Sequence, residues 1–294
     1  MNRKAFIFII LGAIFWGTIS WYVKHLYALG FTAMEVVLIR ALTSSIILII
    51  MMLFFSRNEL KLHKWTDLKY FIGTGVISII FFNYSLFKAI ELSTIPIASA
   101  LLYTAPAFVI VLSIFLFQEQ LTKHKLIALF ITLIGIFFVV GLSPFEMSSI
   151  TPIGILFGLG AGFGYALYSI FSKFALQKYS SLTITTYTFL IASLTLLPFF
   201  PSEKLPLLLQ REVIFYGFGL GLLPTAVAYM IYTIGLQYTE ASKASILTTV
   251  EPVVATLIGI FVFREPFSFM QMIGMICILG AVILIHRSTF RSTA

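Results

Sequence analysis

The amino-acid sequence predicts an all-α polytopic membrane protein, with ten transmembrane helices in a 5+5 inverted repeat. Three observations support this prediction. The 294 residues are 60% hydrophobic and 10% charged, and the mean hydropathy is +1.05, whereas soluble chains are about 45–50% apolar and about 25% charged. The apolar residues gather in ten segments of helix length, and the second half of the chain repeats motifs of the first.

Each apolar segment approaches the length of about 20 residues that a helix needs to cross a bilayer. The first segment follows Arg3 and Lys4, contains two Trp and lacks a small-residue cleavage site, so we interpret it as a span and not as a signal peptide. The connections are too short for a soluble domain. The predicted spans are 5–23, 33–55, 69–90, 95–117, 125–142, 153–172, 182–200, 213–236, 243–263 and 268–286.

The Lys and Arg residues predict the orientation, because cytoplasmic loops retain more of them than outer loops do. With the N-terminus inside, thirteen lie on the inner side and five on the outer side, and Arg40 lies within a span. We therefore expect a multi-pass protein of the cell membrane with both termini in the cytoplasm. The inner set is Arg3, Lys4, Arg57, Lys61, Lys64, Lys69, Lys123, Lys125, Lys173, Lys178, Lys243, Arg287 and Arg291, and the outer set is Lys24, Lys88, Lys204, Arg211 and Arg264.

Several function classes find no support in the sequence. The net charge of +8 does not indicate nucleic-acid binding, because the cations are scattered at helix ends. Cys277 is the single cysteine, so neither a disulfide framework nor a CxxC site is expected. The spans hold no paired acids, His–Asp pair or GxSxG nucleophile, and no cofactor or metal is expected. The four His residues are widely separated near segment ends: His25, His63, His124 and His286.

An internal repeat relates the two halves. Residues 98–119 read ASALLYTAPAFVIVLSIFLFQE, and residues 244–265 read ASILTTVEPVVATLIGIFVFRE, with eight of 22 positions identical. The predicted halves, 5–142 and 153–287, hold five spans each, so the second half enters the membrane in the opposite orientation. Inverted repeats are typical of secondary transporters, whose substrate site lies near the membrane midplane between the repeats.

These motifs make the chain resemble the EamA-type branch of the drug/metabolite transporter superfamily over nearly its whole length. The resemblance rests on GAIFWGTIS with Trp16 and Gly17, on Arg40, and on the two aligned segments, each with a Pro 13 residues before a Glu. It implies a carrier of small organic solutes, commonly amino acids or other metabolites and often exported. The halves differ where Ala105 stands opposite Glu251 and where the sixth span has Tyr165 instead of Trp, so no particular substrate is implied.

Glu251 is the leading candidate for a site residue. An acid within a span is costly and usually faces a cavity or a partner. Its helix face carries small and hydroxyl side chains, Thr248 among them. Glu251 could bind a substrate amine or titrate a coupled proton. It could equally bond to backbone carbonyls that are freed by Pro252 or by a kink in a neighbouring helix, and the sequence leaves both readings open.

Two prolines and three further charged residues complete the motifs. Pro106 and Pro252 predict kinks at matching positions, because Pro removes a helical hydrogen bond, and we interpret both as gating positions near a central site. Arg40 is a candidate charge partner of Glu251, although snorkelling to the outer interface is favoured. Glu119 and Glu265 are interpreted as turn residues that precede the helix N-caps Thr122 and Ser268.

The remaining candidates are polar and aromatic residues of the spans, because Tyr and Trp offer an organic ligand apolar area and one hydrogen bond. The sequence Gly154-xxx-Gly158-xxx-Gly162 has small-xxx-small spacing, which indicates close helix packing. The candidate substrate-binding residues besides Glu251 are Trp16, Ser20, Asn83, Tyr84, Tyr103, Tyr165, Tyr168, Tyr229, Tyr232 and Thr248.

The expected function is secondary transport of small organic metabolites, amino acids or related compounds, by alternating access and in the export direction. The expected partners are a small-molecule substrate and the lipid bilayer, with a homodimer as a further possibility. The alternatives are a multidrug or nucleotide-sugar type carrier of the same fold and a non-transporting scaffold or receptor. A channel is disfavoured because no filter-like loop or ring of charges is evident.

Overall fold

The computed structural model describes residues 3–141 and 151–291, and these residues form ten apolar helical spans and no β-strand. The predicted all-α fold with ten spans is confirmed. Residue 142, at the predicted end of the first half, lies outside the described residues. The spans are Arg3–Ala28, Ala33–Phe55, Trp65–Leu92, Ile95–Phe117, Lys123–Val140, Pro152–Ala175, Ser181–Phe199, Arg211–Gln237, Ala241–Phe263 and Phe269–Ser288.

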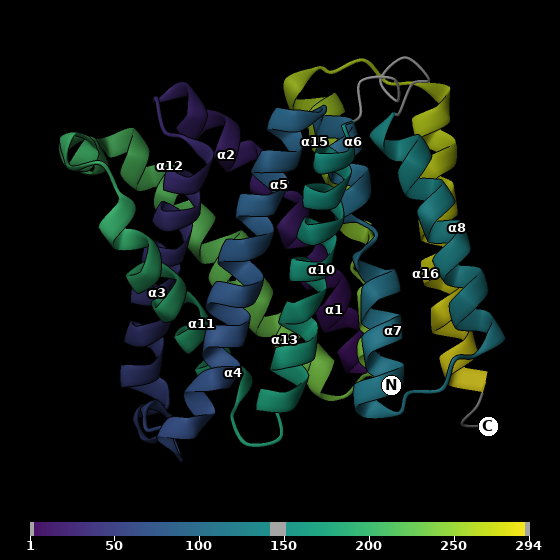
Figure 1. Ribbon diagram of the computed structural model, residues 1–294, viewed down its shortest axis with the longest axis horizontal. Helices are drawn as coiled ribbons and strands as arrows, with labels where there is room; N and C mark the ends of the chain where they lie inside the picture. Colours follow the sequence, from purple (N-terminus) through teal and green to yellow (C-terminus); the bar gives the residue numbers. More distant parts are fainter. Residues whose placement is uncertain (1–2, 142–150, 292–294) are drawn as a thin grey trace.

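Several spans consist of more than one helix (Figure 1). The first half contains α1 (Arg3–Gly17), α2 (Ile19–Ala28), α3 (Ala33–Phe55), η1 (Arg57–Leu60), η2 (Trp65–Asp67), α4 (Leu68–Ile72), η3 (Gly73–Ile80), α5 (Phe81–Leu92), α6 (Ile95–Leu102), α7 (Ala105–Phe117) and α8 (Lys123–Val140). The second half contains α10 (Pro152–Ala175), α11 (Ser181–Leu196), η4 (Leu197–Phe199), η5 (Ser202–Leu209), α12 (Arg211–Gly221), η6 (Leu222–Val227), α13 (Ala228–Gln237), α14 (Ala241–Leu247), α15 (Val250–Phe263) and α16 (Phe269–Arg291).

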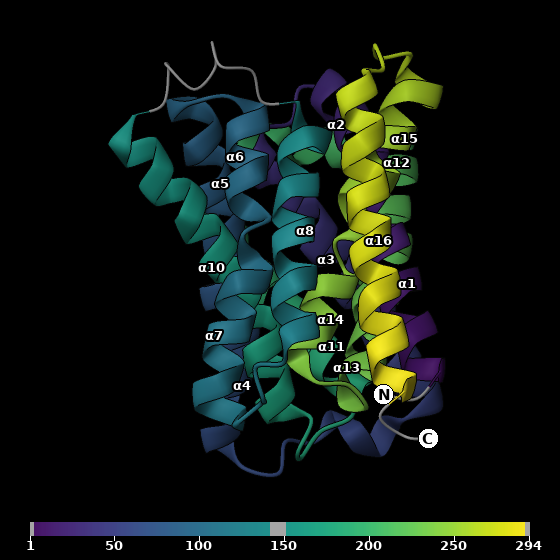
Figure 2. The same ribbon diagram turned by 90° about the vertical axis from the view of Figure 1, so that its right-hand side faces the viewer.

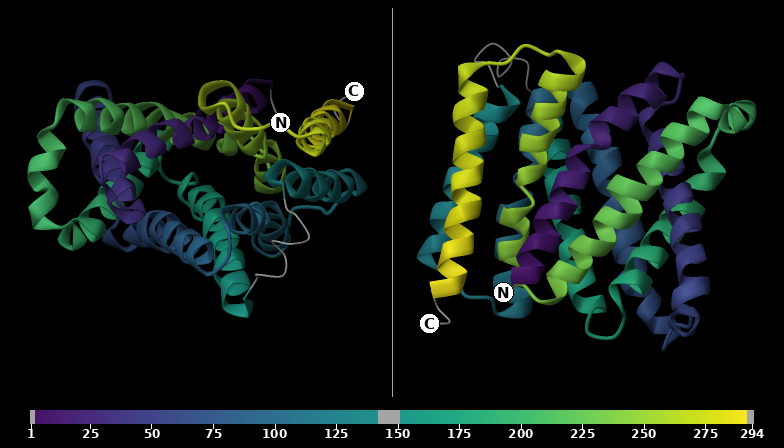
Figure 3. Two further views of the ribbon diagram at one scale, coloured as in Figure 1. Left: turned by 90° about the horizontal axis from the view of Figure 1, so that it is seen from above. Right: turned by 180° about the vertical axis from the view of Figure 1, so that it is seen from behind.

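The spans run side by side, and both ends of the chain lie at the same end of the bundle (Figures 1 and 3). We call this end the terminal face. The opposite end, which carries the turns between α2 and α3, between α5 and α6, and between α15 and α16, is the loop face (Figure 2). Helices α8 and α16 pack as a pair at one side of the bundle (Figure 3).

Short polar connections determine where the next apolar helix begins. Thr122, Thr151 and Ser180 each accept a hydrogen bond from the backbone N–H three residues further on, which satisfies a donor that has no partner inside the helix. Ser268 accepts from the N–H of Gln271 in the same way. The predicted N-caps Thr122 and Ser268 are therefore confirmed.

The third span of each half contains a wider helical turn. The π-helical segments η3 and η6 lie at closely corresponding places in the repeat. Within η3, the Ser78 hydroxyl donates to the Gly164 carbonyl of α10 at 2.7 Å, and Thr74 contacts Thr188 of α11 at 2.6 Å. Because π-helical turns are uncommon and often mark functional places, their paired occurrence points to the centre of the bundle.

The fourth span of each half is broken, whereas the sequence predicted a continuous helix kinked at Pro. Helix α6 ends at Leu102 before α7 begins at Ala105, and α14 ends at Leu247 before α15 begins at Val250. Pro106 and Pro252 therefore lie in the first turn of a new helix, where the missing N–H would have had no helical partner.

Threonine side chains satisfy the backbone at both breaks. The hydroxyl of Thr104 donates to the Leu101 carbonyl at 2.6 Å, and that of Thr249 donates to the Ile246 carbonyl at 2.6 Å. Thr248 donates to the Ser245 carbonyl at 2.8 Å. The Leu101 and Ile246 carbonyls also accept from the N–H groups of Thr104 and Thr249 at 3.2 Å, so the turns keep these oxygens paired at a depth where no water is available.

The glycine series of the sixth span packs against the first break. A Cβ atom at Gly162 would lie 2.8 Å from the Leu101 carbonyl oxygen and 3.0 Å from that of Leu102, and one at Gly158 would overlap the Leu101 side chain. Only glycine admits this approach of α10 to the break. The close packing predicted from the small-xxx-small spacing is confirmed.

The α8–α16 pair provides a test of the packing. A Cβ atom at Gly274 of α16 would lie 2.5 Å from the Gly135 carbonyl oxygen and 2.7 Å from the Val139 nitrogen, whereas one at Gly280 of the same helix would meet nothing within 4 Å. Overpacking costs about 1–3 kcal/mol. Gly274→Ala should therefore lower the apparent Tm in detergent by roughly 2–10 °C, and Gly280→Ala should leave it unchanged or raise it. Equal effects of the two substitutions would contradict this crossing.

Candidate substrate cavity and its closure

A cavity of about 340 Å³ lies between the two halves, and we call it the central cavity. Tyr27, Ala33 and Ile95, at the loop-face ends of α2, α3 and α6, line its mouth. Most of its wall is aliphatic or aromatic, and its two charged lining residues are Arg40 and Glu251. A largely apolar cavity with a few converging polar groups is typical of a site for a small organic molecule.

The break in the ninth span places Glu251 in the first turn of α15, within the membrane-spanning part of the chain. Its Oε2 accepts a hydrogen bond from the Tyr165 hydroxyl at 2.9 Å, and its Oε1 accepts one from the Tyr103 hydroxyl at 3.5 Å. The free N–H groups at a helix N-terminus carry partial positive charge that favours an acid there. The helix break therefore makes a carboxylate tolerable at this depth.

Arg40 of α3 points into the bundle. The sequence favoured an extension of this side chain to the outer interface, and the structure does not show it. Its side chain is 5% exposed and lines the central cavity. No ion pair within 4.0 Å joins it to Glu251 among the described residues. Arg40 and Glu251 thus share one cavity without contacting each other.

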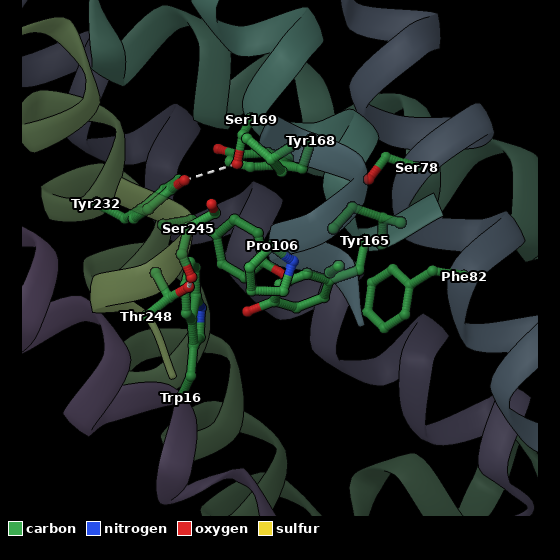
Figure 4. A pocket seen from close by; sticks show the side chains of 14 residues that line it. Trp16, Ser78, Phe82, Pro106, Tyr165, Tyr168, Ser169, Tyr232, Ser245 and Thr248 are labelled. Atoms are coloured by element: carbon green, nitrogen blue, oxygen red, sulfur yellow. Dashed lines mark hydrogen bonds between the residues drawn. The ribbon is translucent and has the colours of Figure 1, made fainter. Parts of the chain in front are cut away.

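Four aromatic side chains lie between the central cavity and a smaller one on the side of the terminal face, and Figure 4 shows the lining of the smaller cavity. This aromatic layer consists of Trp16, Phe82, Tyr165 and Tyr229, which line both cavities. The ring centroids of Trp16 and Tyr229 are 4.8 Å apart, and those of Phe82 and Tyr165 are 5.6 Å apart. The smaller cavity, about 20 Å³, has room for roughly one water molecule, and we call it the lower cavity.

The structure brings most of the candidate residues from the sequence to these two cavities. Tyr84 lies elsewhere: it is 46% exposed and packs against Phe157. Pro252 lines a third pocket, near Glu265. The central cavity is lined by Trp16, Ser20, Arg40, Asn83, Tyr103, Tyr165, Tyr229 and Glu251, and the lower cavity by Trp16, Pro106, Tyr165, Tyr168, Tyr229, Tyr232 and Thr248.

On the terminal-face side of the lower cavity, hydrogen bonds that involve its lining residues join α10 to α13 and close the bundle there. Tyr232 and Ser169 share a hydrogen bond of 2.6 Å (Figure 4), and Tyr168 and Thr233 share one of 2.9 Å. One turn further on, the Lys173 ammonium donates to the carbonyls of Leu236 and Thr239 at the end of α13.

Glu119 extends this closure to the loop that follows α13. Besides its predicted place in a turn, it binds this loop through its carboxylate. Its carboxylate accepts from the N–H of Ala241 at 2.7 Å and of Ser242 at 3.2 Å, and also from the Ser242 hydroxyl. The first half of the chain is thereby attached to the N-terminus of α14 in the second half. Lys125 adds an ion pair with Glu240 at 2.6 Å and lies 3.6 Å from Glu119.

Glu265, the counterpart of Glu119 in the repeat, has the same backbone setting but a different partner. Both residues follow a position with left-handed backbone, Gln118 at φ 55° and Arg264 at φ 56°. The Glu265 carboxylate is about half exposed and pairs with Lys24 at 2.7 Å. A pocket of about 260 Å³ is lined by Glu265 and by Ile95 at the start of α6. The loop face is therefore open where the terminal face is closed.

Sequence reasoning missed several residues of the site. Phe82 and Ser169 resemble ordinary span residues, and nothing in their local sequence marks them. Lys125, the first residue of a predicted span, and Glu240, in a predicted connection, had no expected role in the site, yet the Lys125 side chain is 3% exposed. A signal did exist for Glu119, because its identity with Glu265 across the repeat separated it from the apolar background. No three His, Cys, Asp or Glu side chains gather into a metal-binding group within residues 3–141 and 151–291.

Comparison with known proteins gives consistent matches. A model of the EamA-like transporter family matches residues 3–141 and again residues 152–287. An uncharacterized transporter of Archaeoglobus fulgidus is 35% identical over 69% of this chain and 71% of its own length. The uncharacterized inner membrane transporter YicL of Salmonella typhimurium is 22% identical over 99% and 97% of the two chains. One solved crystal structure of a protein covers 100% of both chains with a TM-score of 0.80 and 17% identity, which shows the shared fold.

The ion pair at the terminal face predicts a pH dependence. Burial disfavours the charged form of Glu240, but the hydrogen bonds and charges of Lys125 and Lys243 outweigh it and hold the pKa of this carboxyl below its usual value. A lowered pKa in the folded state stabilises the protein at neutral pH, and this contribution is lost as the pH falls through the pKa. Glu240→Gln should lower the apparent Tm at pH 7 and should reduce the further loss below about pH 4.5.

The matched control for this variant is Glu91→Gln, because the Glu91 side chain is 64% exposed and pairs only with the neighbouring Lys88 among the described ion pairs. Exposed pairs of this kind contribute little, so this variant should show the wild-type Tm at both pH values. A Glu240→Gln protein with the full wild-type loss at low pH would contradict the assignment.

Proposed function

The chain belongs to the EamA-like transporter family, and on that premise we propose that it is a secondary carrier of small organic metabolites, amino acids or related compounds, in the cell membrane. The observation that carries the proposal is the central cavity, which lies between the two halves and reaches the loop face. A cavity closed by hydrogen bonds on one side and open on the other is what a carrier needs in order to hold one solute at a time.

The substrate contacts follow from the lining of the central cavity. The carboxylate of Glu251 faces the solute and binds its amine or exchanges a coupled proton, and the Tyr103 and Tyr165 hydroxyls orient this carboxylate. Trp16 and Tyr229 provide the floor on which an apolar part of the solute rests. Ser20 and Asn83 offer further hydrogen bonds. Tyr168, Tyr232 and Thr248 lie beyond the aromatic layer and line the path between the terminal face and the central cavity, by which an exported solute enters.

The distribution of Lys and Arg supports an orientation with the terminal face in the cytoplasm. Both ends of the chain then lie in the cytoplasm, and the central cavity opens to the outside. An exported solute enters when the terminal face is open and leaves in the state that the structure represents.

Alternating access is supported by the different partners of Glu119 and Glu265. Glu119 holds the N-terminus of α14, while Glu265 lies beside an open pocket at the N-terminus of α6. Because the halves are related by the repeat, the opposite state follows by exchanging these roles. Glu119 then releases Ala241, and Glu265 leaves Lys24 and binds the N–H of Ile95. The two glutamates act as latches at opposite faces.

Transport into proteoliposomes tests the function and the role of Glu251. Flux of a panel of radiolabelled amino acids and related metabolites is measured with and without a pH gradient. Glu251→Gln should reduce the flux of a transported solute by about ten-fold or more, because a hydrogen bond to a charged group is lost. Glu91→Gln, an exposed control, should transport as the wild type does. Full flux and unchanged pH dependence in Glu251→Gln would rule out both the amine and the proton role.

The latches are tested by solvent access to the lower cavity. Ser245 lines that cavity, so Ser245→Cys in a Cys277→Ser background reports access for a membrane-impermeant maleimide added at the terminal face. Glu119→Gln should raise the labelling rate several-fold, because the charged hydrogen bonds to α14 are weakened. Glu265→Gln should leave the rate unchanged or lower it. Equal labelling in both variants would contradict the exchange of latches.

A further inference from the structure

Arg40 is a buried charged residue to which the proposed function assigns no role. Its Nε and Nη2 atoms are buried and donate to no acceptor among the described residues, although the side chain is 5% exposed. The residue lies within a span and lines the central cavity. An arginine at this depth is costly and persists where it has a partner or a function.

The nearby carboxylates do not supply that partner. Glu251 lies within electrostatic range of Arg40, but its two oxygens accept hydrogen bonds from Tyr165 and Tyr103, and no ion pair links it to Arg40 among those of the described residues. Glu35, on the same helix, is paired with Lys204 at 2.8 Å and accepts from the Thr32 N–H. The Arg40 charge therefore has no carboxylate partner among the described residues, and its side chain, which interacts with Tyr229, forms part of the cavity wall.

We propose that Arg40 binds the acid group of the transported solute and thereby selects organic molecules that carry a carboxylate or a similar planar oxyanion. The guanidinium presents its N–H donors in a planar fork that matches two carboxylate oxygens. This inference rests on the proposed function, because it assigns one end of the solute in the same cavity.

The two charged groups make the cavity bipolar. With Arg40 and Glu251 both ionised, the lining of the central cavity has no net charge. The two charged groups form no ion pair with each other among the described residues. A solute with an acid group at Arg40 and an amine near Glu251 restores partners to both. Aliphatic side chains such as Val36, Val37 and Leu86 line the same cavity and accommodate an apolar body between the two charged ends.

The competing role for Arg40 is structural, as a fixed cation that offsets Glu251. The two roles differ in a measurable way. A structural cation affects all ligands of the cavity alike, whereas an acid-binding residue affects only those that carry the acid group.

Binding to the full-length protein in lipid nanodiscs, measured by calorimetry, separates these roles with three probes of one shape. L-leucine carries both charged groups, 4-methylpentanoate lacks the amine, and L-leucinamide lacks the acid. Arg40→Gln should weaken leucine and 4-methylpentanoate by about 10- to 100-fold and leave leucinamide unchanged. Arg40→Lys should give an intermediate loss, because it keeps the charge and loses the fork. Arg57→Gln, in the exposed helix η1, is the matched control.

Each result decides between named outcomes. If Arg40→Gln weakens all three probes equally, Arg40 is structural and the proposal fails, while the transport function stands. If the wild type binds leucinamide as tightly as leucine, the acid group is not recognised and the proposal fails even when the variant does not fold. If the wild type binds none of the probes, both the assignment of Arg40 and the amino-acid class in the proposed function are overturned.

Discussion

The need to satisfy every backbone polar group inside the membrane governs this structure. Two spans are interrupted at Tyr103–Thr104 and Thr248–Thr249, where lipid could not replace the lost helical bonds. At each interruption a threonine hydroxyl and its own backbone N–H both bond to the preceding carbonyl, and α10 presents Gly162 to the first one. Irregular backbone at this depth is tolerated where it is buried in protein or lines a cavity. The breaks therefore occur beside the central cavity.

The charges of the site depend on the same breaks. A continuous ninth span would leave Glu251 in the middle of a helix, facing no free N–H groups, whereas the restart at Val250 places it in a first turn. Tyr103, at the end of α6, reaches this carboxylate from the other broken span. One local feature, repeated in both halves, therefore provides the tolerated acid and one of the groups that orient it.

The sequence predicted the coarse architecture well, because hydropathy and the repeat depend on local composition. It identified the ten spans and the close packing at Gly158 and Gly162, and most of its candidate site residues line the two cavities. It predicted kinks instead of breaks, because Pro106 and Pro252 are compatible with both. It favoured the outer membrane interface for the Arg40 side chain and gave Glu119 only a role in a turn. The structure differs in both cases, because the surroundings of these residues are formed by helices distant in the chain. Only tertiary structure places Lys125 beside Glu240.

The two faces of the bundle are not equally equipped for closing. Pro96 and Thr94 occupy the repeat positions of Ser242 and Glu240, so the start of α6 lacks one N–H and one carboxylate that the start of α14 provides. No Lys or Arg lines the pocket beside Glu265. Under the proposed alternating access, a weaker closure at the loop face predicts that the empty protein rests mostly with that face open. A solute approaching from the terminal face then needs a conformation that is sparsely populated. Its half-saturation concentration at the terminal face is therefore expected to exceed that at the loop face.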